Sequence, residues 1–372
     1  MERYEADVAI IGAGPAGTAA AAHLGALGVE RVVLVDRHDF PRDKTCGSGI
    51  SPKGIKTLQK LGVWDEVAPH AYPIRGLRLV TPGGLESWQS GGEAAEAVVC
   101  YRRILDHVLL KKALASGTRF VADFDAAEAI EEGGRMVGFK SRAGDEVRAR
   151  HTLVAGGSHC RVGLPALRPR RVIQAIMGWW DHAEFRPHHV EMIFDRMLDP
   201  YYGWLFPETE TRVNIGITYE DPPDGKKNAR ELFRAFLDKH YAGALANATQ
   251  VGGWRGHPIV WSYAIEQLTA PGRIAIGESG LMTHPATAEG IYQGMRSGML
   301  GAEAVASILS GRADEAAALA RYERECKRAF QLSFWGGGVF RGLVRNGGLD
   351  FVVGLSQQPA VRTITARLMA SM

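Results

Sequence analysis

The sequence predicts an α/β protein in which a Rossmann-like nucleotide-binding domain carries an inserted, mostly antiparallel β-sheet domain and a helical C-terminal region. Three observations support this fold class. A strand, a glycine-rich turn and a helix follow one another at the N-terminus, the middle of the chain contains strand-like segments with alternating aromatic residues, and the last third is rich in helical patterns. The 372 residues are also more than one core usually serves, so two or three substructures are expected.

The N-terminal pattern occupies residues 7–36. "DVAII" (7–11) is typical of a short buried strand, "GAGPAG" (12–17) forms the turn, and the Ala-rich run that follows indicates a helix. A second strand, "RVVLVD" (31–36), ends in an acid 24 residues after the first glycine. Because all the parts occur in this order, the pattern predicts a dinucleotide site rather than a chance glycine turn.

Each part of this pattern has a physical role. Gly12 permits the tight turn, Gly14 lets the backbone approach a pyrophosphate, and Gly17 lets helix and strand pack closely. Pro15 and Ala16 open the helix, whose free N–H groups attract phosphate oxygens. Asp36 is placed to accept hydrogen bonds from ribose hydroxyls.

Composition excludes several other classes of protein. Charged residues make up 23% of the chain and the net charge is +3, which is too small to favour a nucleic-acid partner. The N-terminus lacks the shape of a signal peptide, and no window holds about 18 uninterrupted apolar residues, so a cytoplasmic location is expected. Four scattered cysteines suggest neither a metal site nor a disulfide framework.

A second motif lies at residues 272–305. "RIAI" indicates a strand, "GESGLMTHPATA" a loop, and "EGIYQGMRSGMLGAEAVASIL" a helix. This segment resembles the second FAD-binding motif of the flavoproteins related to para-hydroxybenzoate hydroxylase, which implies non-covalent FAD as the cofactor. The resemblance assigns flavin contacts to Glu278, where the family usually has Asp, and to Pro285, Gly290 and Ile291. The helix N-terminus would stabilise negative charge on reduced flavin.

Two further segments bear on this resemblance. "YRRILDHVLLKKALASG" (101–117) resembles the group's "R-x-x-(F/L)-D" segment and implies that Arg102 lies near the flavin; a simple amphipathic helix is the alternative. "LVAGGSHCRV" (153–162) lacks the Asp-Gly pair that serves NADPH binding in the hydroxylases. The electron donor therefore stays open between NAD(P)H, a ferredoxin and a flavin reductase.

The loop "PRDKTCGSGISPKG" (41–54) is similar to the "K-x-C-G-x-G" loop of the geranylgeranyl reductase family. The match assigns Lys44, Cys46, Gly47 and Gly49 to a loop that covers the flavin. Arg37, beside Asp36, is assigned to the same cofactor site.

The family's "Y-x-W-x-F-P" segment is matched by Tyr202, Trp204 and Phe206, which alternate and therefore share one face of a strand. They are expected to line an apolar substrate site above the flavin, and an ordinary aromatic sheet core is the alternative. The resemblance to this family covers roughly residues 5–310.

These matches imply a discontinuous FAD-binding domain and a substrate domain. The former is expected at 1–72, 98–162 and 265–310, and the latter at 73–97 and 163–264. Residues 311–372 are expected to be helical. Arg341 and Arg345, one helical turn apart there, suggest a basic face for a membrane surface, although packing on the sheet domain is favoured.

The resemblance implies a flavoenzyme that reduces carbon–carbon double bonds of an apolar substrate, isoprenoid-like or a natural product. Cys46, His284 and Tyr202 are the candidate catalytic residues, with a loop role for Cys46 and a backbone-bonded imidazole at His284 as the alternatives. A monooxygenase or halogenase of the same fold is the second hypothesis. A non-catalytic flavin-binding module is the third. A partner protein that donates electrons is compatible with the first two.

Overall fold

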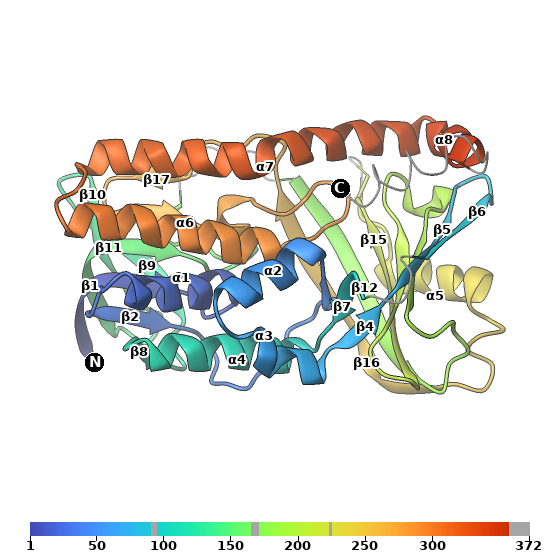
Figure 1. Ribbon diagram of the computed structural model, residues 1–372, viewed down its shortest axis with the longest axis horizontal. Helices are drawn as coiled ribbons and strands as arrows, with labels where there is room; N and C mark the ends of the chain where they lie inside the picture. Colours follow the sequence, from blue (N-terminus) through green and yellow to red (C-terminus); the bar gives the residue numbers. More distant parts are fainter. Residues whose placement is uncertain (91–94, 165–170, 223–224, 357–372) are drawn as a thin grey trace.

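The computed structural model describes residues 1–90, 95–164, 171–222 and 225–356. Two large sheets form its two halves, and one long C-terminal helix extends along both (Figure 1). The fold class predicted from the sequence is confirmed: a Rossmann-like half carries a mostly antiparallel sheet and C-terminal helices. The expected domain bounds stay a proposal, and the part of the helical region at 357–372 lies outside the described residues.

The first half is built on sheet A, which runs β17-β18-β11-β1-β2-β8 with β10 and β9 attached to β11. The pairings of β1 with β2 and β11, of β2 with β8 and of β11 with β18 are parallel, whereas β9, β10 and β17 pair antiparallel. Its strands are β1 (Arg3–Ile11), β2 (Val32–Val35), β8 (Arg119–Val121), β9 (Ala126–Glu132), β10 (Arg135–Ser141), β11 (Glu146–Val154), β17 (Thr269–Ala270) and β18 (Arg273–Ala275).

Two glycines make the packing of this half possible. Gly12 has a φ of +96°, and a Cβ there would lie 2.6 Å from the carbonyl oxygen of Ala155, so only glycine fits the turn. Gly298 of α6 (Ile291–Leu309) faces α1 (Pro15–Ala26), and a Cβ at this position would lie 2.2 Å from the carbonyl oxygen of Ala16. Small residues therefore let two helices approach each other closely above the sheet.

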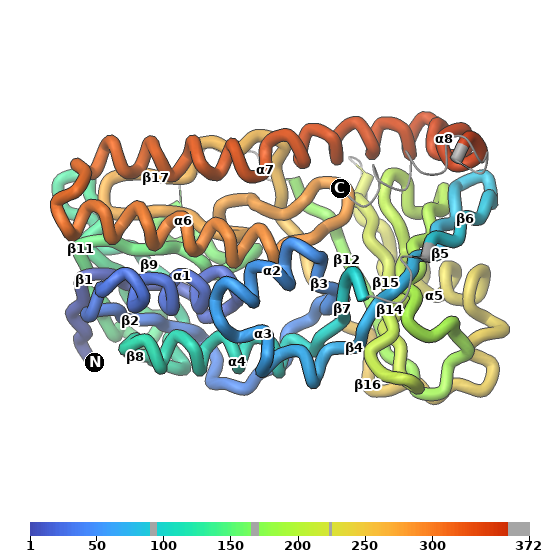
Figure 2. The backbone as a smooth tube through the Cα atoms, in the orientation of Figure 1, coloured from blue at the N-terminus to red at the C-terminus, as the bar shows by residue number. Residues whose placement is uncertain are grey.

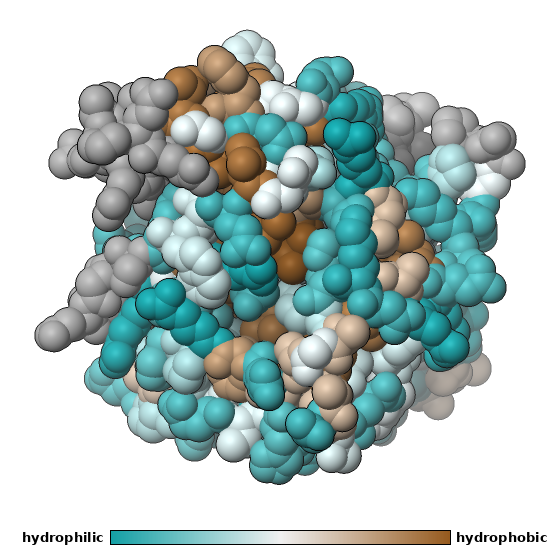
Figure 3. All heavy atoms as spheres, turned by 90° about the vertical axis from the view of Figure 1, so that its right-hand side faces the viewer, coloured by the Kyte–Doolittle hydropathy of each residue, from teal (hydrophilic) through white to brown (hydrophobic). Residues whose placement is uncertain are grey.

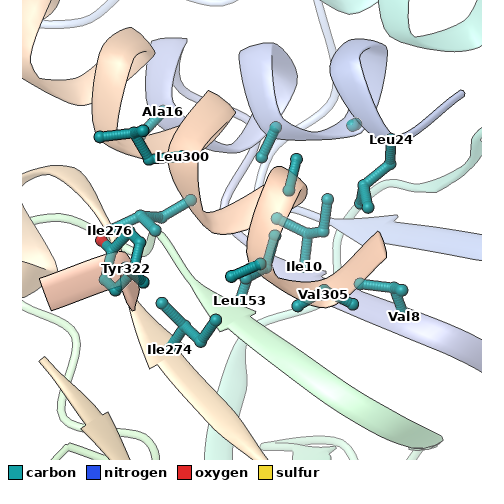
Figure 4. Packing of buried hydrophobic residues seen from close by; sticks show 14 of the residues in the cluster. Val8, Ile10, Ala16, Leu24, Leu153, Ile274, Ile276, Leu300, Val305 and Tyr322 are labelled. Atoms are coloured by element: carbon teal, nitrogen blue, oxygen red, sulfur yellow. The ribbon is translucent and has the colours of Figure 1, made fainter. Parts of the chain in front are cut away.

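The core of this half lies between sheet A and these two helices. Ile10 and Leu153 point up from the strands, and Leu24, Leu300 and Val305 point down from the helices (Figure 4). Full burial of such side chains contributes roughly 1.5–3 kcal/mol each. The hairpin of β9 and β10 belongs to a second core on the opposite face, so the sheet is covered on both sides.

The helices are α1 (Pro15–Ala26), α2 (Pro52–Lys60), α3 (Trp64–Val67), α4 (Arg102–Ala115), α5 (Ala229–His240), α6 (Ile291–Leu309), α7 (Glu315–Arg345) and α8 (Gly348–Ser356). Short 3-10 turns are η1 (Ala68–His70), η2 (Arg196–Leu198) and η3 (Gly277–Gly280). Pro52 opens α2 behind the capping side chain of Ser51, and Asp314 caps α7 by accepting from the Ala317 amide at 2.8 Å.

The second half is built on sheet C, which runs β16-β12-β15-β14-β13-β5-β6 and is antiparallel except for β13 and β5. Its strands are β5 (Gly76–Val80), β6 (Glu86–Ser90), β12 (Arg171–Asp181), β13 (His189–Ile193), β14 (Gly203–Pro207), β15 (Arg212–Tyr219) and β16 (Thr249–Trp261). A small sheet of β3 (Gly49–Ile50), β4 (Tyr72–Ile74) and β7 (Ala97–Val99) lies where the two halves meet (Figure 2).

The two faces of sheet C have different neighbours. One face packs on α5 through Ile215, Ile217, Phe233 and Phe236. The register pairs Trp204 with Gly216 and Gly216 with Met177, so these residues form one row on the other face. That face also meets Val344, Leu349 and Val353 of the C-terminal helices. The sheet therefore has a structural face and a face that looks towards the cofactor half.

The C-terminal helices pack on the sheet domain, as the sequence favoured, and the alternative of a basic surface face is not borne out at Arg341. Arg341 does not lie on a basic surface face, because it is 5% exposed and its guanidinium donates to Glu220 and to the Tyr263 hydroxyl at 2.8 and 2.9 Å. It also stacks over the ring of Trp261 at 4.5 Å. Arg345 stays exposed, so the two arginines form no shared basic surface.

Candidate active site

The glycine-rich turn ends β1 and begins α1, as the sequence predicts. Gly14 is the N-cap residue and Pro15 the first helical residue, and no side chain caps this helix. Ala16 and Gly17 follow inside the first turn, where helix N–H groups point outward. The N-terminus of α1 is therefore suited to hold a phosphate group.

Asp36 lies at the end of β2, beside this turn. One carboxylate oxygen accepts from the Ala13 amide at 2.8 Å and the other from the His38 amide at 3.0 Å. These bonds fix the carboxylate next to the glycine turn and leave lone pairs for a further donor. Arg37 is exposed at the rim of the same site.

A buried ionic network lies under the turn. Arg102 donates to both oxygens of Asp106, at 2.7 and 2.8 Å, and Asp106 is completely buried. Arg42 adds an ion pair to Asp106 at 3.1 Å, and its tip lies 4.0 Å from the position of a Gly14 Cβ. Its Nε lies 4.0 Å from a carboxylate oxygen of Asp36. The Nη2 atom of Arg42, which lies nearest Gly14, is the donor that we expect to reach a pyrophosphate held at this turn.

Lys44 supplies a second cation on the same loop. Its ammonium donates to Nε2 of His257 at 2.6 Å, and Ser158 Oγ lies 3.1 Å from the same nitrogen. Burial, with Arg102 nearby, lowers the pKa of Lys44 to about 8. Burial and the charge of Lys44 lower the pKa of His257 to about 3, so this imidazole is a neutral acceptor.

The second motif forms the opposite wall. Glu278 is the second residue of η3 and accepts from the Val260 amide at 3.0 Å, and burial raises its pKa. Pro285 is buried against Gly337 of α7. Gly290 is the N-cap residue of α6 with no side-chain cap, and Ile291 is its first helical residue. A second open helix N-terminus thus points towards the site.

His284 is held by the backbone at both ring nitrogens. Its Nδ1 accepts from the amides of Ala286 and Thr287 at 3.3 and 3.2 Å, so the proton is assigned to Nε2, which donates to the Ser333 carbonyl at 3.2 Å. Burial lowers its pKa to about 4. This geometry favours a role in fixing the flavin loop over a role in proton transfer.

Cys46 lies in the loop between the two halves. The Ser48 amide donates to its Sγ at 3.3 Å, and both Arg102 and Tyr202 are close enough to interact with it electrostatically. Gly47 and Gly49, on either side of Ser48, contact the ring of Phe206. The structure therefore brings Cys46 together with one cofactor-side cation and with the aromatic face of sheet C.

The three aromatic residues of the predicted substrate pocket share that face. Tyr202 precedes β14 and donates to the Thr287 carbonyl at 2.5 Å, and Trp204 donates to Asn214 at 2.7 Å. The rings of Trp204 and Phe206 lie 6.2 Å apart, and Phe206 is only partly buried. Their polar atoms are bonded to the protein, so the surface they offer a ligand is apolar.

Two carboxylates near this face were not singled out from the sequence. Glu208 continues the alternation of Tyr202, Trp204 and Phe206, and it accepts from Trp179 Nε1 at 3.0 Å. Burial raises its pKa to about 7, against the opposing effect of bonds from Tyr101 and Trp179. The two-residue spacing was a usable signal for Glu208.

Glu289 precedes Gly290 and bonds Ser51 Oγ and Gln293. Burial raises the pKa of its carboxyl group. Nothing in the sequence indicated that Glu289 and Ser51, which are 238 positions apart, would be in contact. Glu289 brings a buried carboxyl group to the N-terminus of α6.

These residues fit FAD. The α1 N-terminus and Arg42 supply donors for a pyrophosphate, and Asp36 supplies an acceptor for a ribose. Glu278, in the second motif, stands beside Lys44 and Gly157, where the ribityl chain is expected. The N-terminus of α6 and the loop at Cys46 enclose the remaining side.

Comparison with known proteins agrees with this fit. Residues 5–333 match the family of FAD-binding domains. The menaquinone reductase of Mycobacterium tuberculosis is 30% identical over 321 residues, which cover 80% of this chain and 76% of the relative. A digeranylgeranylglycerophospholipid reductase of Methanopyrus kandleri is 25% identical over 89% of this chain and 84% of its own length.

Solved structures share the fold. A geranylgeranyl bacteriochlorophyll reductase-like protein from Thermoplasma acidophilum superposes with a TM-score of 0.84 at 20% identity, covering 96% of this chain and 92% of that one. A flavin-dependent brominase superposes with a TM-score of 0.80 at 19% identity, covering 98% and 93%. The fold is thus shared by enzymes of different chemistry.

Proposed function

We propose that this chain, which belongs to the family of FAD-binding domains and is an FAD-dependent oxidoreductase similar to geranylgeranyl reductases, reduces carbon–carbon double bonds of an apolar, isoprenoid-like substrate. The observation that carries the proposal is the contact between the flavin-covering loop and the aromatic face of sheet C. Gly47 of that loop lies against the rings of both Trp204 and Phe206. An apolar chain that packed on these rings would lie next to Cys46.

Reduction of a double bond needs a hydride on one carbon and a proton on the other. Bound, reduced FAD supplies the hydride. The proton must come from the protein or from water. Cys46 is our candidate donor, because it interacts both with Arg102 of the cofactor half and with Tyr202 of the sheet C half. A thiol is a much stronger acid than a hydroxyl.

Tyr202 is better suited to shaping the pocket than to giving a proton. Its hydroxyl is already committed to the Thr287 carbonyl, and burial raises its pKa. The same argument applies to His284, whose ring nitrogens are both engaged. Among the three catalytic candidates, Cys46 is therefore the one we assign to proton transfer.

The test is an anaerobic half-reaction. The FAD of the purified protein is reduced chemically, an isoprenoid quinone or a geranylgeranyl lipid in detergent is added, and flavin absorbance is followed without oxygen. We expect the flavin to reoxidise and the product to gain two hydrogen atoms, as measured by mass spectrometry.

A flavin-dependent monooxygenase or halogenase is the second candidate, favoured by the fold shared with the brominase. It predicts no reoxidation by substrate alone and product formation only after oxygen is admitted. That outcome would overturn the reductase proposal. If the flavin is bound but no product forms, either without oxygen or after oxygen is admitted, the result would instead favour a non-catalytic flavin-binding module.

A further inference from the structure

Helix α7 connects the two halves of the molecule with its inner side. Its first half packs on α6 and contributes Tyr322 and Phe330 to the core of the cofactor half. Its second half reaches over sheet C, where Phe340 lies 5.6 Å from the ring of Phe194 and Val344 joins the cluster around Trp204. The end of α7 therefore covers the aromatic face that we assign to the substrate.

The outer side of the same helix is apolar where this cover lies. Leu332, Trp335 and Val339 are 82, 69 and 67% exposed, and Leu343 extends the row. Their spacing of three and four residues places them on one side of the helix. Phe351 of α8, also 69% exposed, lies beyond the end of the row. Seen from the sheet C end, hydrophobic side chains gather on the upper part of the molecule, where Figure 1 places α7 and α8 (Figure 3).

Positive charge predominates at the surface of α7. All of α7 is described, and its exposed charged residues are Arg321, Arg324, Lys327, Arg328 and Arg345. Its three glutamates are partly buried: Glu323 accepts from the Leu268 amide at 2.7 Å, and Glu325 pairs with Arg328 at 3.5 Å. Arg321, Arg324 and Arg328 precede Leu332 at steps of three and four residues, so they continue the outer side towards the N-terminus of the helix.

We propose that this outer side of α7, from Arg321 to Leu343 together with Phe351, binds the surface of an anionic lipid bilayer. A helix with apolar residues and cations on its free side is suited to lie in the interface between headgroups and acyl chains. The cations would meet the anionic headgroups, and the large apolar residues would leave water. Among the described residues no helix is long and apolar enough to cross a membrane, so the contact is with the surface.

The outer side of α7 lies close to the proposed substrate site, which suggests what membrane binding would do. Because Phe340 and Val344 on the inner side of α7 border the face of sheet C, the membrane would lie one helix away from the substrate site. An apolar substrate could then move between lipid and pocket with little exposure to water. This part rests on the proposed function, whereas the docking itself does not.

The experiment is flotation of the full-length, FAD-loaded chain with vesicles of phosphatidylcholine, with and without phosphatidylglycerol. We expect binding to the anionic vesicles that weakens with salt. The double variant L332S/W335S should lose binding by about tenfold or more, since burying one such side chain is worth roughly 1.5–3 kcal/mol. W88S is the matched control, because Trp88 is 45% exposed on β6, outside this surface. R324E/R328E should remove the preference for anionic lipid.

Three results would overturn the proposal. The first is no vesicle binding by the wild-type chain, and the second is equal binding by L332S/W335S. The third is loss of binding when the chain is ended after Ser356, which would place the anchor in residues 357–372. Size-exclusion chromatography tests whether the outer side of α7 instead binds a second copy of the chain. If the wild-type chain is a dimer, if W335S makes it a monomer, and if the wild type does not bind vesicles, the bilayer proposal is contradicted.

Flavin absorbance confirms that the variants keep FAD. The anaerobic half-reaction in detergent separates this proposal from the proposed function. L332S/W335S should reoxidise with detergent-solubilised substrate at the wild-type rate, because detergent bypasses the membrane. Failure of the half-reaction in the wild-type chain would therefore contradict the reductase proposal and leave the membrane proposal intact.

Discussion

The facing surfaces of the two large sheets have opposite chemical character, polar on sheet A and apolar on sheet C. The edge of sheet A offers backbone amides and paired charges: an uncapped helix N-terminus, Asp36 held by two amides, and Arg102 paired with Asp106. The facing side of sheet C offers rings whose polar atoms are bonded within the protein, as in the pairs of Trp204 with Asn214 and Tyr202 with Thr287. A polar, charged cofactor suits the first surface and an apolar ligand suits the second.

Because of this difference, we expect the reaction to take place at the seam, the junction between the two halves where Cys46 lies. Cys46 lies on a loop of the cofactor half, yet its neighbours include the aromatic residues of the other half. A reaction that joins a polar cofactor to an apolar substrate needs such a junction. The predictions below test first the seam, then the apolar surface, and then the polar one.

The largest effect is expected for Cys46→Ser. Serine has nearly the same volume, so FAD binding and the fold should be unchanged, but its hydroxyl is a far weaker acid. General acid catalysis contributes about 10²–10⁴-fold, and the rate of anaerobic flavin reoxidation by substrate should fall within that range. Stopped-flow absorbance measures it.

Cys160→Ser, a partly buried cysteine on another loop, is the control and should react at the wild-type rate. An equal rate for Cys46→Ser with an unchanged flavin spectrum would remove Cys46 from the mechanism. A small loss of rate with a shifted flavin spectrum would instead show that it only covers the ring.

Next comes Glu208, a carboxylate on the apolar surface. Its pKa is raised from the ordinary 4.5 to about 7, so the folded protein binds the proton more tightly than the unfolded chain. The stability that this proton contributes is present below pH 4.5 and is lost as pH rises through about 7. The difference corresponds to about 3 kcal/mol of unfolding free energy.

Glu208→Gln should therefore unfold at higher denaturant concentration than wild type above about pH 8, and the two should converge near about pH 5. Urea unfolding at both pH values measures this. Glu210→Gln, whose side chain is exposed on the same hairpin, should show no such pH dependence. A constant difference between Glu208→Gln and wild type across this range would show that Glu208 ionises normally.

The same contrast explains what the sequence could reveal. The cofactor half depends on glycines and acids at short, fixed spacings, so the cofactor and the fold class were predicted correctly, and the turn at Gly12–Gly17 and Asp36 lie side by side as expected. The apolar half depends on contacts between distant segments. Ser51 meets Glu289, and Arg341 turns inward to Glu220, although neither contact has a local signal. Alternation predicted the face shared by Tyr202, Trp204 and Phe206, but not how α7 covers it.

The smallest effect is expected at the polar surface, for Asp36→Ala. The carboxylate is fixed by the Ala13 and His38 amides, and its remaining lone pairs are available to a ribose. Hydrogen bonds to a charged group are worth roughly 1.5–3 kcal/mol, so FAD affinity should fall by about one to two orders of magnitude. Titration of the apoprotein with FAD, followed by quenching of flavin fluorescence, measures the dissociation constant.

Two further variants separate the charge from the geometry. Asp36→Asn keeps an oxygen for the Ala13 amide and should lose less affinity than Asp36→Ala. Asp43→Ala removes an equal charge from an exposed position on the neighbouring loop and should bind FAD as wild type does. If all three variants bound FAD alike, the polar surface would owe its affinity to the backbone and Arg42. In that case the cofactor surface would bind FAD mainly through backbone amides, and the substrate surface would bind its ligand through side chains. The proposed contrast between a charged and an apolar surface would then be wrong.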